Sequence, residues 1–275
     1  MKKIFCLLLA ICFIFNCGDK ITVYVSGYAI LDGYNVDAIY WKNGKEIIIK
    51  NTVKNPSAES IFVLGKDIYI AVNDKDFKAK YWKNGEFIYL PVDNEKSLTK
   101  SIFVINKDVY VAGFDGFNKP VYWKNNEKVM LPVCSECPGS SANSIFVSGN
   151  DVYVAGYDVY RATYWKNGKA FHLTDGEYTQ AASSVFVTGN DVYIAGDEDG
   201  KAKYWKNGRG VYLDEGTEAN SIFVLGNDVY VAGYSGRPGE SEKPIAKYWK
   251  NGIAVNLTDG TYSAFAKSIF VVEEK

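Results

Sequence analysis

The chain has 275 residues, 15% of them aromatic and 23% charged, and its formal net charge at pH 7 is −1. This near-neutral balance offers no strongly basic surface, and the sequence contains no recognised nucleic-acid-binding motif, so we expect no nucleic-acid partner. The length is sufficient for one large domain.

The first element is a short apolar segment that is typical of an export signal. After the basic start Met-Lys-Lys, residues 4–15 form an apolar run that is too short to span a bilayer as a helix but suits a signal peptide. The run ends in Ile-Phe-Asn-Cys-Gly, which resembles a relaxed bacterial lipobox. We therefore expect residues 1–16 to be a cleaved signal peptide, Cys17 to be lipidated and residues 17–20 to form a short tether.

This start predicts an exported lipoprotein of the bacterial cell envelope or outer surface. The lipid would be its only attachment to a membrane. Secretion without lipid and an uncleaved anchor are the alternatives.

The rest of the chain consists of copies of one repeat. The pair Tyr-Trp recurs at spacings of 41, 41, 42, 40 and 44 residues, and a second motif, Ser-Ile/Val-Phe-Val, accompanies it. Such self-similarity indicates a repeat array. The pairs begin at Tyr40, Tyr81, Tyr122, Tyr164, Tyr204 and Tyr248, and the second motif begins at Ser60, Ser101, Ser144, Ser184, Ser221 and Ser268.

Each copy predicts four short strands, which we name a to d in chain order. In the copy at residues 144–173, strand a is Ser-Ile-Phe-Val, and Gly-Asn-Asp provides the turn before strand b. Strand c contains Tyr-Trp-Lys. The pair Asn167-Gly168 between strands c and d is the strongest short signal for a hairpin, because both residues tolerate positive φ.

Four strands in roughly 40 residues is the spacing of a β-propeller blade. The six copies predict an all-β fold, a six-bladed propeller of four-stranded antiparallel blades over residues 21–275. The first copy lacks strand a, and the last motif, Ser268 to Val271, has no strand b after it. We expect this C-terminal strand a to pair with the N-terminal strands b to d, which closes the ring and removes an open sheet edge.

The repeated aromatic residues and the single histidine have structural explanations. All six tryptophans belong to the Tyr-Trp motif, so we expect them to pack between blades. His172 lies in strand d, where other copies have Tyr89, Tyr212 and Asn256, which predicts an outer-strand residue exposed to solvent. With one histidine and no metal-binding motif, we expect no metal and no cofactor.

Cys134 and Cys137 allow three interpretations. A redox pair requires a helix N-terminus that stabilises the thiolate, and no helix is predicted there. A metal half-site requires a second pair of Cys or His ligands. We favour a local disulfide in an oxidising compartment, which stabilises the fold by at most about 2 kcal/mol because its loop is small.

The connections between strands separate the scaffold from the candidate function. The a–b and c–d turns hardly change between copies, whereas the b–c and d–a connections vary in length and chemistry. The antiparallel order places the variable connections at one end of the strands, where proteins usually place recognition. Their mixture of rings, cations and acids suits glycan or peptide binding. The candidate binding residues are Phe117, Tyr157, Tyr160, Arg161, Asp175, Tyr178, Tyr234 and Arg237.

The layout Ala-x-Tyr-Trp-Lys-Asn-Gly, followed by Thr-Asp-Gly and Ala-x-Ser-Ile-Phe-Val, resembles exported bacterial β-propeller repeat proteins over residues 21–271. It is also distantly similar to the HAF extracellular repeats, whose signature is Ala-Phe-x-Trp-x-Asn-Gly. The resemblance implies the architecture. It implies no particular activity and no catalytic residues.

Two functions are compatible with these features. The one that we favour is an envelope-anchored binding or adhesion propeller, a monomer that recognises a glycan or protein partner through the variable connections. The alternative is a carbohydrate-active envelope enzyme, a glycosidase or lyase, with carboxylates at the mouth of the central channel. Paired catalytic carboxylates lie roughly 5 to 9.5 Å apart, and the sequence identifies no such pair.

Overall fold

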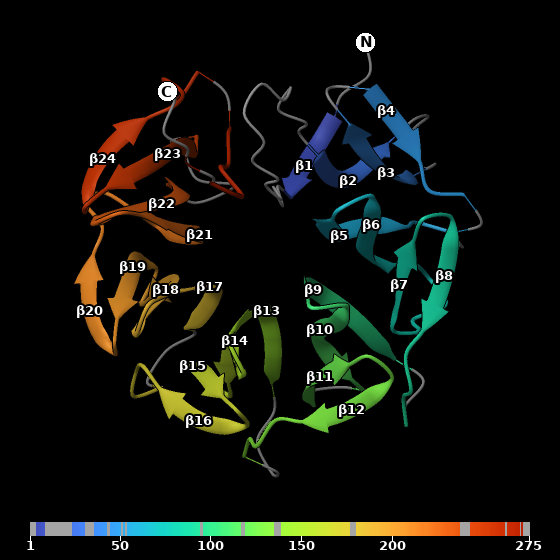
Figure 1. Cartoon of the computed structure of the whole chain (residues 1–275). Coiled ribbons are helices and arrows are strands. Elements are labelled where there is room, and N and C mark those ends of the chain that lie inside the picture. The colour runs from blue at the N-terminus through green and yellow to red at the C-terminus, as the bar shows by residue number, and fades with distance from the viewer. Residues whose placement is uncertain are drawn as a thin grey trace. The chain divides into compact units, whose positions relative to one another are not determined.

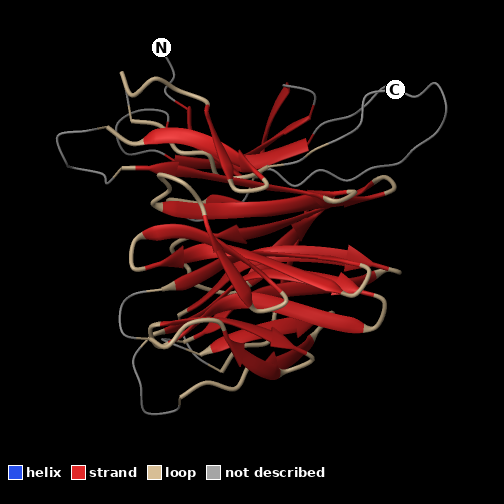
Figure 2. Ribbon diagram, turned by 90° about the vertical axis from the view of Figure 1, so that its left-hand side faces the viewer, coloured by secondary structure: helices blue, strands red, loops and turns tan. Residues whose placement is uncertain are grey.

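The structure, a computed structural model, describes residues 4–8, 24–30, 36–42, 45–50, 52, 54–93, 96–116, 119–134, 139–176, 180–236, 243–261, 263–269 and 271. These residues form six four-stranded antiparallel sheets. Figure 2 shows strands joined by loops, with no helix in the described part of the chain. The predicted all-β class and the four-stranded antiparallel sheets are therefore confirmed.

The chain divides into two compact units, Met1–Met130 and Leu131–Lys275, and each unit holds three sheets in which the strands follow the order of the chain (Figure 1). The first sheet consists of β1 (Ile4–Leu8), β2 (Tyr24–Ile30), β3 (Val36–Lys42) and β4 (Lys45–Ile48). The second consists of β5 (Ser57–Leu64), β6 (Asp67–Asn73), β7 (Lys80–Lys83) and β8 (Glu86–Tyr89). The third consists of β9 (Ser97–Ile105), β10 (Asp108–Asp115), β11 (Pro120–Lys124) and β12 (Glu127–Met130).

The second unit repeats this organisation. The fourth sheet consists of β13 (Ser140–Ser148), β14 (Asp151–Asp158), β15 (Arg161–Lys166) and β16 (Lys169–His172). The fifth consists of β17 (Ala181–Thr188), β18 (Asp191–Glu198), β19 (Lys201–Lys206) and β20 (Arg209–Tyr212). The sixth consists of β21 (Glu218–Leu225), β22 (Asp228–Ser235), β23 (Ile245–Lys250) and β24 (Ile253–Asn256).

One hydrogen-bonded network joins the a–b turn to the c–d turn of a repeat. In the fourth sheet, the Lys166 ammonium lies 2.8 Å from the Asp151 carboxylate, and the Asn167 amide donates to the same carboxylate at 2.7 Å. The Asn167 side-chain oxygen accepts a hydrogen bond from the backbone N–H of Val152 at 2.8 Å. Asn167 and Gly168 both have positive φ, as the predicted two-residue hairpin requires.

This turn network recurs, which explains why the turns hardly change between copies. Its hydrogen bonds from Lys166 and Asn167 hold the pKa of Asp151 below its usual value. The first copy departs from the pattern, because Thr22 stands in the place of the aspartate. The corresponding ion pairs in the other sheets join Lys83 to Asp67, Lys124 to Asp108, Lys206 to Asp191 and Lys250 to Asp228.

A bulge interrupts the a–b pairing at a corresponding place in successive sheets. In the fourth sheet the register shifts between Ala142 and Ser144. A Cβ atom on Gly156 of the neighbouring strand would lie 1.9 Å from the Ser141 carbonyl oxygen. The backbones approach so closely here that only glycine fits without a shift of the chain.

The hydrophobic core lies between consecutive sheets within each unit. In the second unit, one cluster joins the fifth sheet to the sixth and includes Leu213, Ile222 and Trp249. In the first unit, a cluster joins the second sheet to the third and includes Tyr69 and Trp123. The predicted packing of repeated tryptophans between sheets is confirmed in these clusters.

The indole N–H of a buried tryptophan also has a fixed partner. Trp123 Nε1 donates to the Pro91 carbonyl oxygen at 2.8 Å, and Trp249 Nε1 donates to the Asp214 carbonyl oxygen at 2.9 Å. Both acceptors follow strand d of the preceding sheet. The ring therefore fixes the d–a connection as well as the core, and it satisfies its own polar group.

The edge of the first sheet differs from the sequence prediction. β1 pairs antiparallel with β2, at the place where the repeat pattern predicts a strand a from the C-terminus. Residues 263–269 are described and form no strand. An open sheet edge accepts β-prone segments, and the Ile-Phe-Cys-Leu-Leu sequence of β1 provides one.

In the second unit, two kinds of hydrogen bond join strand a of one sheet to strand a of the next, and residues 263–269 make both of them with the sixth sheet. The Ile269 backbone N–H donates to the Ser221 hydroxyl at 3.2 Å, and the Asn220 amide donates to the Ala266 carbonyl oxygen at 2.9 Å. The segment therefore contacts β21 as a further strand a would. The corresponding pairs between consecutive sheets of the second unit are Val185 with Ser144, Ile222 with Ser184, and Asn143 with Ala182.

Candidate functional site

Four of the predicted binding residues belong to the fourth sheet and its connections, and two of them are in direct contact. Tyr160 lies in the turn between β14 and β15 and is 48% exposed. The Arg161 side chain donates from Nε to the Asp175 carbonyl oxygen at 3.2 Å, which links the b–c connection to the d–a connection. Tyr157 lies in β14, opposite Ala162. The role of these residues in binding stays a prediction.

A further predicted binding residue, Tyr234, is buried. Tyr234 is only 5% exposed, because its ring packs edge-on against Phe265 at a centroid distance of 4.8 Å. Little of this ring is accessible to a ligand. Phe117, Tyr178 and Arg237 lie outside the described residues, and their role stays a prediction.

The described cysteine and the histidine both have partners within the fold. Cys134 is disulfide-bonded, whereas its predicted partner Cys137 and the predicted lipidation site Cys17 lie outside the described residues. His172 is exposed at the end of β16, as predicted, and its Nδ1 lies 3.0 Å from the Thr163 hydroxyl. Within the described ranges, no three His, Cys, Asp or Glu side chains gather as metal ligands do.

Three repeats carry a buried lysine immediately before the Tyr-Trp pair. These residues are Lys80 of β7, Lys203 of β19 and Lys247 of β23, whose side chains are 2%, 11% and 1% exposed. Removing an ammonium from water costs several kcal/mol unless nearby groups compensate its charge. The three sheets differ in how they provide this compensation.

In the second sheet, two carboxylates compensate the charge of the buried lysine. The Lys80 ammonium lies 2.8 Å from the Asp74 carboxylate and 2.8 Å from the Asp76 carboxylate. Tyr89 is the residue opposite Lys80 in the sheet, and the ammonium lies 5.4 Å from the centroid of its ring. An ammonium above a ring face gains a further cation–π attraction.

The fifth sheet repeats the arrangement with a glutamate. Lys203 forms an ion pair with Glu198 of β18, and the Tyr212 hydroxyl of β20 donates to the same carboxylate at 2.7 Å. The Lys203 ammonium lies 4.4 Å from the centroid of the Tyr212 ring. An acid of strand b, a lysine of strand c and a tyrosine of strand d satisfy one another, and we name this group the acid–lysine–tyrosine set.

The sixth sheet keeps the lysine and lacks the other two members of the set. Ser235 of β22 stands in the place of the acid, and Asn256 of β24 stands in the place of the tyrosine. Among the described residues, the Lys247 ammonium pairs with Glu215 alone, at 3.3 Å, and the Glu215 side chain is 79% exposed. Because an exposed carboxylate is screened by water, this compensation is weak.

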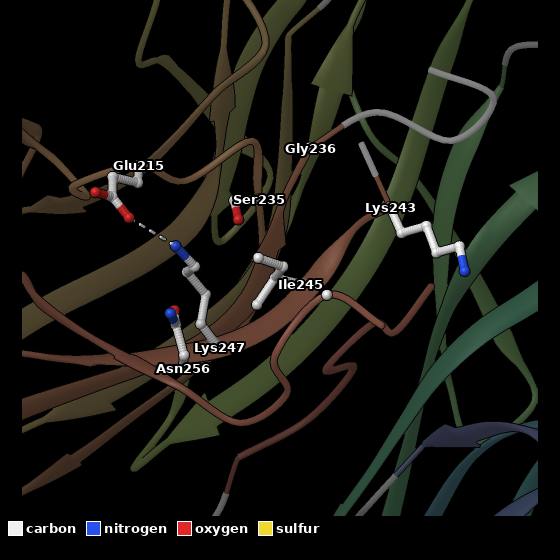
Figure 3. A pocket seen from close by; sticks show the side chains of 8 residues that line it. Glu215, Ser235, Gly236, Lys243, Ile245, Lys247 and Asn256 are labelled. Atoms are coloured by element: carbon white, nitrogen blue, oxygen red, sulfur yellow. Dashed lines mark hydrogen bonds and ion pairs between the residues drawn. The ribbon is translucent and has the colours of Figure 1, made fainter. Parts of the chain in front are cut away.

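A cavity of about 520 Å³ lies beside Lys247 (Figure 3). This volume is within the range of about 300 to 1,000 Å³ that is typical of small-molecule sites. Ser235, Ile245, Lys247 and Asn256 line it from one face of the sheet, since the cross-strand register places them on the same side. The smaller serine and asparagine leave open the space that the complete set fills in the fifth sheet.

The side chains around this cavity have distinct orientations. Figure 3 shows the Lys247 ammonium directed toward Glu215, with Ser235 and Asn256 near it. Lys243 also lines the cavity but points away, and its ammonium donates to the Thr261 carbonyl oxygen at 2.6 Å. Among the described residues, Lys247 is therefore the cation that a ligand in the cavity would meet.

Two carboxyl groups interact where the fifth sheet packs against the sixth. Burial raises the pKa of Asp197 of β18 to about 7, and the negative charge of Glu218 of β21 adds to the rise. The pKa of Tyr234 is also raised, first by burial and then by its hydrogen bond to Glu218. Two interacting carboxyl groups, one of which has a raised pKa, are an arrangement that general acid–base catalysis uses.

The group around Lys247 was not predicted from the sequence. The predicted site consists of rings, arginines and an acid of the connections, whereas Lys247 and Asn256 belong to strands and Ser235 ends one. A signal was present in the copies, because three of them read Ala-Lys-Tyr-Trp and only the last has serine five residues after the strand-b tyrosine. This signal becomes informative only once the acid, the lysine and the tyrosine are known to touch.

Comparison with known proteins gives no assignment: the chain matches no family model and no curated protein. The resemblance to exported propeller-repeat proteins therefore stays a prediction. No helix long and apolar enough to cross a membrane occurs among the described residues.

Proposed function

We propose that the six sheets are the blades of a closed β-propeller. The four-stranded repeat, the packing of consecutive sheets within each unit and the contacts of Ile269 and Ala266 with the sixth sheet support this proposal. Cleavage of residues 1–16 as a signal peptide would withdraw β1 and leave the edge of β2 open. Ser268 to Val271 would then fill that edge as strand a.

Hydrogen–deuterium exchange on the chain without residues 1–16 tests the closure. Deletion of residues 263–275 should reduce the protection of β2 amides as well as that of β21 amides, because both strands would lose a neighbour. Deletion of residues 272–275 alone is the control and should leave both strands protected. Unchanged protection of β2 in the longer deletion would contradict a closed ring.

The chain functions as an envelope-anchored binding or adhesion protein that recognises a glycan or protein partner through its variable connections. The observation that carries this conclusion is the cavity beside Lys247. Ser235 and Gly236 of the b–c connection border it, and so does Glu215 of the d–a connection. It therefore lies at the end of the strands where the repeats differ, which is where a rigid scaffold usually carries recognition.

A glycan array and an envelope pull-down with the purified chain test this function. We expect a partner whose binding falls at least tenfold in Tyr160→Ala, Arg161→Ala or Lys247→Met, at an unchanged melting temperature. Lys206→Ala, in a c–d turn at the other end of the strands, is the matched control. Loss of binding in the control alone would assign recognition to the turns, and the absence of any partner would contradict a binding function.

The proposed anchor has a separate test. Cells that express the chain should incorporate a radiolabelled fatty acid into it, and Cys17→Ser should abolish the incorporation. Labelling that persists in Cys17→Ser would contradict lipidation at this residue.

The interaction between Asp197 and Glu218 favours a second candidate function, a carbohydrate-active envelope enzyme. Asp197 would donate a proton to the leaving group, and Glu218 would act as the base or nucleophile. Incubation with envelope polysaccharides should then release reducing ends. Asp197→Asn and Glu218→Gln should each stop the release without weakening binding. If both variants release reducing ends as fast as the parent chain does, these residues are excluded as catalysts.

A further inference from the structure

We infer that the cavity beside Lys247 binds a carboxylated sugar, a hexuronic acid residue, whose carboxylate takes the place that an acidic side chain has in the fifth sheet. The inference rests on the proposed binding function and names the ligand of that site. It follows from the comparison of Lys247 with its two counterparts and from the polar groups that line the cavity.

The two counterparts of Lys247 show that a lysine at this position binds a carboxylate. Lys80 binds the carboxylate of Asp74 at 2.8 Å, and Lys203 binds that of Glu198. In the sixth sheet the strand-b residue is Ser235, so strand b has no carboxylate at this position. Because the space is open in the cavity beside Lys247, a ligand carboxylate can enter where the side chain is missing.

The charge of the site favours a single carboxylate over a phosphate. Lys247 is 1% exposed, and its ammonium has three N–H donors, one of which is directed to Glu215. One bound carboxylate would compensate the ammonium from within the cavity, where the exposed Glu215 compensates it only weakly. A phosphate dianion would bring a second negative charge close to Glu215, and that charge would be repelled.

The remaining lining favours a sugar over an acidic peptide. Ser235 and Asn256 provide a hydroxyl and an amide that both donate and accept hydrogen bonds, and Glu215 provides an acceptor for sugar hydroxyls. Ile245 offers an aliphatic surface for the C–H face of a pyranose ring. A hexuronic acid carries both chemistries on one ring, namely one carboxylate for Lys247 and several hydroxyls for the other groups.

Isothermal titration of the purified full chain provides the test. The probes are trisaccharides of galacturonate, glucuronate and mannuronate, each compared with its carboxyl-reduced neutral counterpart. Sodium acetate, inorganic phosphate and a hexaglutamate peptide are measured in parallel. At least one uronate trisaccharide should bind at least tenfold more tightly than its neutral counterpart and more tightly than phosphate or the peptide.

Four variants assign this preference to the cavity. Lys247→Met should remove it, with at least a tenfold loss of affinity, and Lys247→Arg should retain most of it. Ser235→Glu should also weaken binding at least tenfold, since it restores an internal carboxylate at the place of the ligand. Ser235→Ala is the matched control, which keeps the space open and should weaken binding less than threefold. Melting curves of all four variants verify that they are folded.

Several outcomes would overturn the inference. These are equal affinity for charged and neutral trisaccharides, tighter binding of phosphate or hexaglutamate, and uronate binding that survives both Lys247→Met and Ser235→Glu. If a neutral glycan or a protein binds the chain independently of Lys247, the proposed binding function stands and this inference fails. If no probe, glycan or envelope component binds, both fail.

Discussion

The fifth and sixth sheets have the same strand-c sequence, Ala-Lys-Tyr-Trp-Lys-Asn-Gly, yet they place its first lysine in different surroundings. Lys203 is satisfied by a glutamate and a tyrosine of its own sheet. Lys247 has a serine and an asparagine at those places and borders a cavity. In a repeat protein, a candidate site can therefore arise through the loss of residues around a charge that the scaffold retains.

The second sheet extends the comparison, because it contains the same seven residues. Its Lys80 has two aspartates within 2.8 Å. A cavity of about 820 Å³ lies near Tyr89 in this sheet, and Lys80 does not line it. A cavity near a repeat is thus not sufficient to expose the lysine, and the missing acid and ring distinguish the sixth sheet.

The largest effects on stability should come from the tryptophan that the fifth and sixth sheets both contain. Trp205 and Trp249 are 1% and 0% exposed, and their truncation to alanine should each lower the free energy of unfolding by about 3 to 5 kcal/mol. Urea denaturation of the two variants provides the measurement. A loss below about 1 kcal/mol in either variant would show that its ring does not support the core.

The buried lysines should respond differently to the same substitution. Lys80→Met leaves Asp74 without its cation in a site where the side chain is 0% exposed, so the free energy of unfolding should fall by about 3 kcal/mol. Lys247→Met leaves only the exposed Glu215, and stability should change by less than about 1 kcal/mol or increase. Equal losses in urea denaturation would mean that Lys247 is as well compensated as Lys80.

A smaller, pH-dependent difference in stability should come from the strand-b residue that precedes Glu198 in the fifth sheet and Ser235 in the sixth. The fifth sheet has Asp197 there and the sixth has Tyr234. Because the pKa of Asp197 is raised to about 7 in the folded protein, the folded state binds a proton that the unfolded state releases. Stability should therefore fall as the pH rises from about 4 to about 7.

Asp197→Asn removes this dependence. The variant should be more stable than the parent by about 1 to 3 kcal/mol at pH 8 and should differ little at pH 4. Thermal or urea denaturation at the two pH values measures the difference. A variant that is destabilised equally at both would show that Asp197 is held ionised by partners, contrary to its raised pKa.

The smallest effect on stability should again be equal in the fifth and sixth sheets. Gly208 and Gly252 have φ values of +81° and +87°, and a Cβ atom on either would meet nothing within 4 Å. Alanine at each position should cost about 1 kcal/mol through backbone strain alone. Different losses in the two sheets would indicate that one turn contacts something beyond its own hairpin.

The sequence predicts much of this fold because each local signal repeats. The Asn-Gly pairs predict the c–d hairpins, and Asn167 and Gly168 have the required positive φ. The tryptophans predict the inter-sheet core, and Trp123 and Trp249 lie in it. The edge of the first sheet was not predicted correctly in detail, since periodicity does not decide which of two β-prone segments pairs with an open strand.

The candidate site was harder to predict. The variable connections indicated the end of the strands at which the cavity beside Lys247 lies, but the aromatic criterion selected Tyr234, whose ring is buried against Phe265. The bulge in strand a shifts which residues share a face, and the electrostatic interaction between Asp197 and Glu218 joins two sheets. Such relations depend on register and packing, which a single sequence does not reveal.

The turn network has a consequence for how such an array can change during evolution. Each complete copy places one lysine and one aspartate of this network side by side, as Lys166 and Asp151 do at 2.8 Å. Gene duplication that adds or removes a copy therefore leaves the local charge of the turns balanced, because every copy brings both signs. The number of repeats can change without creating a charged stripe, and selection is free to act on the connections at the other end of the strands.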